Sequence, residues 1–267
     1  MAAELFRRGV RDHRRALVGW CVGIIGYVAL IASIFPSIEG SPQLDELIKS
    51  YPDVLKSLFG ITGAGRLTSG AGFLDAELFS FMLPLLVLVL AISSGARTFA
   101  GEEDAGRLEL VLAYPIMRRS AVVAKGLAVC AEVLVACAAA IAAILLFDAV
   151  VGLELSFAHV AGSFAWLVAL GLFYGWLALA VGAAYPSRAL ALGLAAGTAA
   201  AGYLVGGLHD LAGWLEPFRF LSPFWLVGQS PLQGGTDAVG VVVVLVAAIA
   251  FLAAGAVLVE RRDLEVP

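Results

Sequence analysis

Six long apolar runs alternate with short polar stretches along the chain. Each run supplies about the 20 apolar residues that an α-helix needs to cross a bilayer. The runs are continuous and rich in Leu and Ala, without the apolar–polar alternation of barrel strands. The predicted spans are residues 17–38, 76–96, 122–151, 157–184, 189–208 and 238–259. The pattern predicts an all-α integral membrane protein with one transmembrane domain over residues 1–267.

Basic residues between the runs predict how the chain is oriented. Of the 17 Lys and Arg residues, 13 lie in the N-terminal stretch, in the loops after the second and fourth spans, and in the C-terminal tail. Loops rich in Lys and Arg stay in the cytoplasm. We therefore expect both termini to be cytoplasmic, and an even number of spans agrees with this expectation.

The composition supports the membrane class and excludes others. Hydrophobic residues make up 61% of the chain, charged residues 14%, and the mean hydropathy is +0.95. Soluble domains are about 45–50% apolar and about 25% charged. We expect the lipid bilayer as a partner and no nucleic acid. Cys21, Cys130 and Cys137 all lie in apolar runs without CxxC spacing, which argues against a disulfide framework and a zinc site.

Three segments lie outside the predicted bilayer core. Residues 1–16 are basic with apolar side chains at helical spacing, which predicts an interfacial amphipathic helix. Residues 39–75 and 209–237 form external segments. The second is apolar and interrupted by prolines, so it predicts short helices dipping into the outer leaflet. Its aromatic residues suit a membrane interface, and they are Trp214, Phe218, Phe220, Phe224 and Trp225. A passive anchor and a cap over the bundle are both open.

The loop after the second span carries the most informative pattern. Acidic residues open segment 101–115, where they favour the positive end of a helix, and Pro115 ends it. Leu108, Val111 and Leu112 form a small apolar face between charged flanks. Such a helix suits docking in a groove of another protein. A solvated loop whose charges only set the topology is the alternative.

The residues of this loop resemble a known family. The pattern G-E-E-x-x-G-x-L-E-L-x-L-A-x-P-x-x-R, with Lys125 at the start of a span, is similar to permease subunits of bacterial ATP-binding-cassette exporters of the type-2 permease family. The matching positions are Gly101, Glu102, Glu103, Gly106, Leu108, Glu109, Leu110, Leu112, Ala113, Pro115, Arg118 and Lys125. The layout of the six spans agrees, although Arg107 stands where similar permeases often carry Thr.

The resemblance implies specific partners and roles. Segment 101–115 would be the coupling helix that docks on a separate pair of ATP-binding subunits. Its interface residues would be Glu102, Glu103, Asp104, Arg107, Leu108, Glu109, Val111 and Leu112. Residues 1–16 would be the connecting helix, and residues 209–237 would hold an external re-entrant helix pair. A second permease copy, identical or related, would complete a pathway lined by the second and fifth spans in a bacterial inner membrane.

The resemblance also implies how the work is divided. The chain has no GxxxxGK[ST] phosphate loop. We therefore expect a permease subunit that is no enzyme and holds no cofactor, with ATP and Mg bound by the partner subunit. The implied mechanism is alternating access. The apolar composition favours a hydrophobic or amphipathic substrate.

Few ionisable residues fall inside the predicted spans. Glu132 lies about a third of the way along the third span, where a carboxylate must face protein or water. It is a candidate for a pathway or gating residue, or for a structural hydrogen bond. Asp75, Glu77, Asp148 and Asp210 fall near external span ends and are expected to be hydrated. Glycines four apart, which let helices approach closely, occur at Gly19/Gly23, Gly171/Gly175, Gly193/Gly197 and Gly202/Gly206.

Other function classes need features that are weak or missing in the sequence. An ion-gradient-driven secondary transporter would carry several intramembrane carboxylates or broken helices at the midplane. An intramembrane enzyme would need a catalytic set at one depth, but the three histidines are scattered and no HExxH occurs. A permease-like sensor or scaffold subunit that does not transport is a further alternative.

Overall fold

The computed structural model describes residues 2–38, 50–52, 69–101 and 118–261 of the 267-residue chain. Within these ranges every regular element is a helix. Six helical stretches are long and apolar enough to cross a membrane, which confirms the predicted all-α architecture of six spans. The multi-pass assignment therefore stands on helix length as well as on hydropathy.

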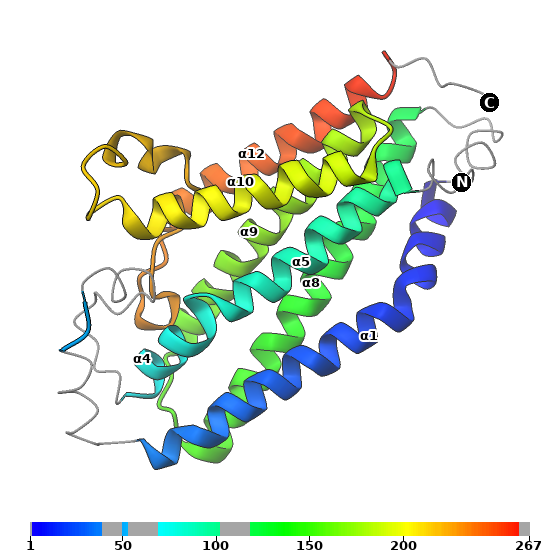
Figure 1. Cartoon of the computed structure of the whole chain (residues 1–267). Helices are drawn as coiled ribbons and strands as arrows, with labels where there is room; N and C mark the ends of the chain where they lie inside the picture. Colours follow the sequence, from blue (N-terminus) through cyan, green and yellow to red (C-terminus); the bar gives the residue numbers. More distant parts are fainter. Residues whose placement is uncertain (1, 39–49, 53–68, 102–117, 262–267) are drawn as a thin grey trace.

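The spans follow one another as an up-and-down bundle (Figure 1). Their helices are α1 (Ala2–Ile34), α5 (Met82–Thr98), α8 (Arg118–Val151), α9 (Phe157–Ala184), α10 (Arg188–Leu208) and α12 (Ala238–Leu258). At 1.5 Å per residue, α8 is about 50 Å long, longer than the roughly 30 Å hydrocarbon core. It therefore tilts or extends past the bilayer.

The second span begins earlier than predicted. The apolar stretch Gly70–Thr98 consists of α4 (Gly70–Leu74), the π-helical turn η2 (Asp75–Phe79) and α5. The Ser69 side chain caps the start by accepting a hydrogen bond from the backbone N–H of Gly72 at 3.2 Å. Residues 70–75 are thus helical, although the predicted external segment 39–75 included them. The glycines that made this stretch resemble a loop allow it to pack closely, since Gly70 lies against the Leu153 backbone.

The first helix is also longer than its predicted span. α1 runs without interruption from Ala2, and Figure 1 shows that its first turns point in a different direction from the rest. No Gly or Pro occurs between Val10 and Val18 to end the helix. The predicted interfacial segment 1–16 and the first span therefore form one helix, which a short 3₁₀ turn, η1 (Phe35–Ser37), follows.

α9 is the central helix of the bundle. It contacts α5, α8, α10 and α12, whereas α1 packs mainly on α8. Small residues allow α9 and α5 to meet closely, because a Cβ on Gly95 would lie 2.1 Å from the Gly175 carbonyl oxygen. Gly171 fits between Val87 and Val133 in the same way. The predicted pair Gly171/Gly175 thus serves packing inside the bundle.

The two ends of the bundle differ. The start of α1, the end of α5, the start of α8 and the end of α12 lie at one end, here named the terminal end (Figure 1). There the Arg119 guanidinium forms an ion pair with the Glu260 carboxylate, which joins α8 to the residue stretch after α12. Residues 209–237, here named the distal segment, lie at the opposite, distal end.

Candidate functional site

A buried polar cluster joins three helices in the part of the bundle nearer the terminal end. The Glu132 side chain on α8 is 3% exposed. The Ser94 hydroxyl on α5 donates a hydrogen bond to its Oε2 at 2.6 Å, and His13 Nδ1 on α1 lies 3.0 Å from its Oε1. Both carboxylate oxygens therefore have partners, as a carboxylate in an apolar bundle requires. Glu132 faces protein, and its role in a pathway or gate stays a prediction.

Lys125 lies two helical turns before Glu132 on α8 and is also buried. Its Nζ donates a hydrogen bond to the Thr98 carbonyl oxygen at 2.5 Å and sits 4.4 Å from the centre of the Phe99 ring. The carbonyl at the last residue of α5 has no partner within the helix, so a cation stabilises this end. α8 thus holds α5 at two levels, through Lys125 and Glu132.

The proposed coupling residues lie outside the described part of the chain. These are Glu102, Glu103, Asp104, Arg107, Leu108, Glu109, Val111 and Leu112. The described residues show what flanks them. α5 ends at Thr98 and α8 begins at Arg118, both at the terminal end, and the Lys125 contacts link these two helix ends.

A second polar site at the distal end was missed by sequence reasoning. Asp75 is 3% exposed rather than hydrated. Its carboxylate accepts hydrogen bonds from the backbone N–H groups of Leu232 and Gln233, both at 3.0 Å, and from the Gln233 side-chain amide at 3.2 Å. These residues belong to η4 (Pro231–Gln233) of the distal segment. The Asp75 carboxylate in the second span therefore ties the distal segment to the bundle. The contact could not be read from the sequence, because its partners lie 157 and 158 residues further along the chain.

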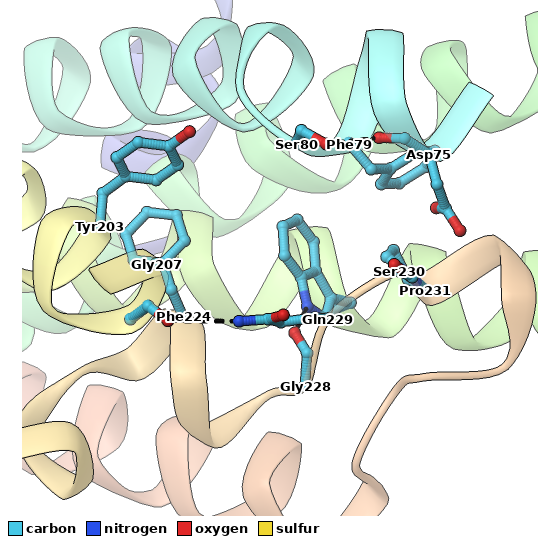
Figure 2. A pocket seen from close by; sticks show the side chains of 12 residues that line it. Asp75, Phe79, Ser80, Tyr203, Gly207, Phe224, Gly228, Gln229, Ser230 and Pro231 are labelled. Carbon is cyan, nitrogen blue, oxygen red and sulfur yellow. Dashed lines mark hydrogen bonds between the residues drawn. The ribbon is translucent and has the colours of Figure 1, made fainter. Parts of the chain in front are cut away.

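A small pocket lies beside this contact (Figure 2). It is bounded by η2, α9, α10 and the distal segment, and its volume is about 60 Å³. Figure 2 shows Asp75 on one side and the side chains of Tyr203 and Phe224 on the other. The Trp166 indole N–H donates a hydrogen bond to the Gly228 carbonyl oxygen at 2.8 Å, which fixes the distal segment over the pocket.

The aromatic residues predicted for the distal segment divide into two groups. Trp214, Phe218 and Phe220 are exposed. Phe224 is buried and packs its ring against Tyr174 and Tyr203. The segment contains the short helices η3 (Glu216–Leu221) and α11 (Pro223–Leu226) before η4.

Trp225, the fifth of these aromatic residues, is half-buried and packs against another aromatic ring and an arginine side chain. Its ring and that of Phe220 lie 5.0 Å apart, and the Arg219 guanidinium sits about 5 Å from each ring centre. The distal segment thus has an exposed aromatic rim and an inward face that packs on the bundle.

An open apolar groove runs between α1 and α5. Its volume is about 520 Å³, and its lining includes Gly19, Trp20, Gly23, Tyr27 and Met82. Ligand sites for drug-sized molecules occupy about 300–1,000 Å³. The groove lining contains no charged residue among those that the structure describes. This surface therefore suits an apolar molecule or another apolar helix.

In the described ranges, no group of three or more His, Cys, Asp or Glu side chains is placed so that it could hold a metal ion. The free cysteines Cys21, Cys130 and Cys137 lie in α1 and α8.

Comparison with known proteins identifies a family for the chain. A search of curated proteins found no match. Residues 9–259, which include all six membrane-crossing helices from α1 to α12, match the sequence family described as "Multidrug efflux system permease Rv1217c, C-terminal domain". The chain therefore belongs to this family of efflux-system permeases.

Proposed function

We propose that the chain is the transmembrane subunit of an ATP-driven exporter and works with a separate pair of ATP-binding subunits. Membership of an efflux permease family and six membrane-crossing helices support the transport part of this proposal. The lack of a phosphate loop in the chain supports a separate ATP-binding subunit, which would hold ATP and Mg. The chain would lie in the bacterial cytoplasmic membrane, with both of its termini in the cytoplasm.

The observation that carries the coupling step is the polar tie between α5 and α8. Segment 101–115 connects these helices, and Lys125 and Glu132 bind α8 to Thr98 and Ser94 on α5. A push on the connecting segment would therefore move both helices together rather than separate their ends. Closure of the ATP-binding pair against this segment would drive alternating access by this route.

Two glycine pairs support a dimer. A Cβ on Gly19, Gly23, Gly193 or Gly197 would meet no atom within 4 Å, whereas Gly202 and Gly206 contact Tyr174 and Ser222. Glycine pairs four apart permit close helix approach, and those on α1 and α10 are unused within the subunit. We assign the faces of α1 and α10 to contact with a second permease copy, identical or related.

The groove between α1 and α5 supports an apolar or amphipathic substrate. It is wide enough for a drug-sized molecule and opens along the same α1 face that carries Gly19 and Gly23. A pathway along this seam would be walled by both subunits.

Co-expression with a candidate ATP-binding subunit tests the coupling proposal. We expect the two to purify together and ATP hydrolysis to drive export. Leu108→Asp and Glu103→Gln should each reduce export by about tenfold or more per ATP hydrolysed, because they alter the docking face. Asp210→Asn removes a distal, exposed charge and is the matched control, with export unchanged. Full export by the Leu108→Asp variant would contradict the proposal.

A further inference from the structure

The pocket at the distal end combines one buried charge with aromatic walls. Among the described residues that line it, Asp75 is the one with a charged side chain. Phe79, Trp166, Tyr203 and Phe224 contribute rings. The volume of about 60 Å³ leaves room for a few water molecules or a small headgroup, since one water needs about 10–15 Å³ by this measure.

The three groups that bind the Asp75 carboxylate are all neutral. Two are backbone N–H groups and one is a side-chain amide. In the described part of the chain, no Lys, Arg or His lies within ion-pair distance of this carboxylate. His159 on α9 interacts with it electrostatically at longer range. Neutral donors stabilise a carboxylate but leave its net charge in place. A carboxylate has about four acceptor positions, so it retains capacity for one more donor.

The pocket walls favour a ligand with an apolar body. Aromatic faces attract cations and also pack against hydrocarbon groups. The Trp166 indole is held by its hydrogen bond to Gly228, and the Phe79 ring packs against it with 6.1 Å between centres. A fixed ring pair beside a buried negative charge has the features of a site for an organic ammonium ion.

We propose that this pocket binds the ammonium group of an apolar organic cation, with Asp75 as its counter-charge. An added positive charge offsets the cost of a carboxylate inside an apolar bundle, which the three neutral donors leave partly uncompensated. The proposal names a substrate class for the efflux function and rests on that function for the transport step alone. Binding is a property of the isolated chain and needs no ATP-binding subunit.

Binding to the purified full-length chain in lipid nanodiscs tests the proposal. The probes are benzylammonium, which carries three N–H donors, its neutral isostere ethylbenzene, and the anion phenylacetate, which is similar in size. We expect saturable binding of the cation that is about tenfold tighter than that of either other probe, corresponding to one charge interaction in a partly shielded site. A cation that binds no tighter than the isostere or the anion would overturn the proposal without any variant.

Substitutions then locate the site. Asp75→Asn should weaken binding of the cation about tenfold and leave binding of the neutral probe unchanged. Asp237→Asn is the matched control, because Asp237 is an exposed carboxylate of the same segment that caps α12 by accepting from the Val239 N–H. If Asp75→Asn does not fold, Phe79→Leu keeps the carboxylate and should weaken the cation several-fold by loss of one ring. Unchanged cation affinity in the folded variants would overturn the assignment.

Transport separates this proposal from the wider one. Loss of cation binding in Asp75→Asn with ATP-driven export of neutral compounds intact supports the cation site and leaves the exporter proposal standing. Export that does not require ATP would refute the exporter proposal. The cation-site proposal would still stand if cation binding depended on Asp75.

Discussion

The Ser94 hydroxyl donates a 2.6 Å hydrogen bond to Glu132, so a side chain of the second span satisfies the buried carboxylate of the third. Ser94→Ala removes this donor and should lower the free energy of unfolding by about 1–3 kcal/mol, the usual cost of leaving a buried polar group without a partner. Thermal unfolding of the purified chain in detergent measures the change.

Ser93→Ala is the control for this substitution. The Ser93 hydroxyl donates a hydrogen bond to the Leu90 carbonyl oxygen of its own helix. Loss of this hydroxyl therefore leaves no buried carboxylate without its donor. Equal destabilisation by the two variants would show that the contact with Glu132 adds nothing.

Tyr174 on α9 offers a substitution that should stabilise the protein. Its hydroxyl is buried, lies against Gly202 of α10, and has no hydrogen-bond partner within the described ranges. Tyr174→Phe removes this unsatisfied group and should raise the free energy of unfolding by about 1 kcal/mol. The melting temperature should rise accordingly, whereas a fall would show that the hydroxyl has a partner in the membrane.

Two glycine positions should respond in opposite ways. Gly95→Ala places a methyl group against the Gly175 backbone and should cost about 1–3 kcal/mol or more through overpacking. Gly193→Ala meets open space in the subunit and should raise the free energy of unfolding of the monomer by up to about 1 kcal/mol, because Ala favours a helix interior over Gly.

The larger variant Gly193→Leu tests the proposed dimer face. It should keep the fold and reduce the dimer fraction seen by crosslinking in membranes, because the close approach of the α10 helices is blocked. An undiminished dimer fraction would remove α10 from the interface.

The orientation is tested by single cysteines in a background without Cys21, Cys130 and Cys137. A cysteine at Asp210 in the distal segment should react with an impermeant maleimide in intact spheroplasts. A cysteine at Arg261, after α12, should react only after permeabilisation. The reverse labelling pattern would place the termini outside.

The sequence predicted the six spans because each lipid-exposed helix must be apolar along its whole length, and this leaves a direct hydropathy signal. It failed at residues 70–75, where glycines that permit close packing on Leu153 resembled a loop. Motif resemblance identified the efflux permease class, and the family match bears out that part.

Contacts between distant residues were beyond the reach of the sequence. Burial of Glu132 followed from its position in a span, but its partners His13 and Ser94 come from other helices. Asp75 resembled a hydrated residue at a span end, because its donors in η4 lie far along the chain. Hydropathy reports the environment of a helix and carries no record of such pairings.

The central claim is that a separate ATP-binding subunit drives export through segment 101–115. Uptake of a neutral, apolar fluorescent compound into inverted membrane vesicles, measured with and without that subunit, tests it most directly. We predict uptake that requires the subunit and ATP, persists when ionophores collapse the proton and sodium gradients, and is lost in Leu108→Asp. Uptake by the chain alone that stops when those gradients collapse would contradict the claim.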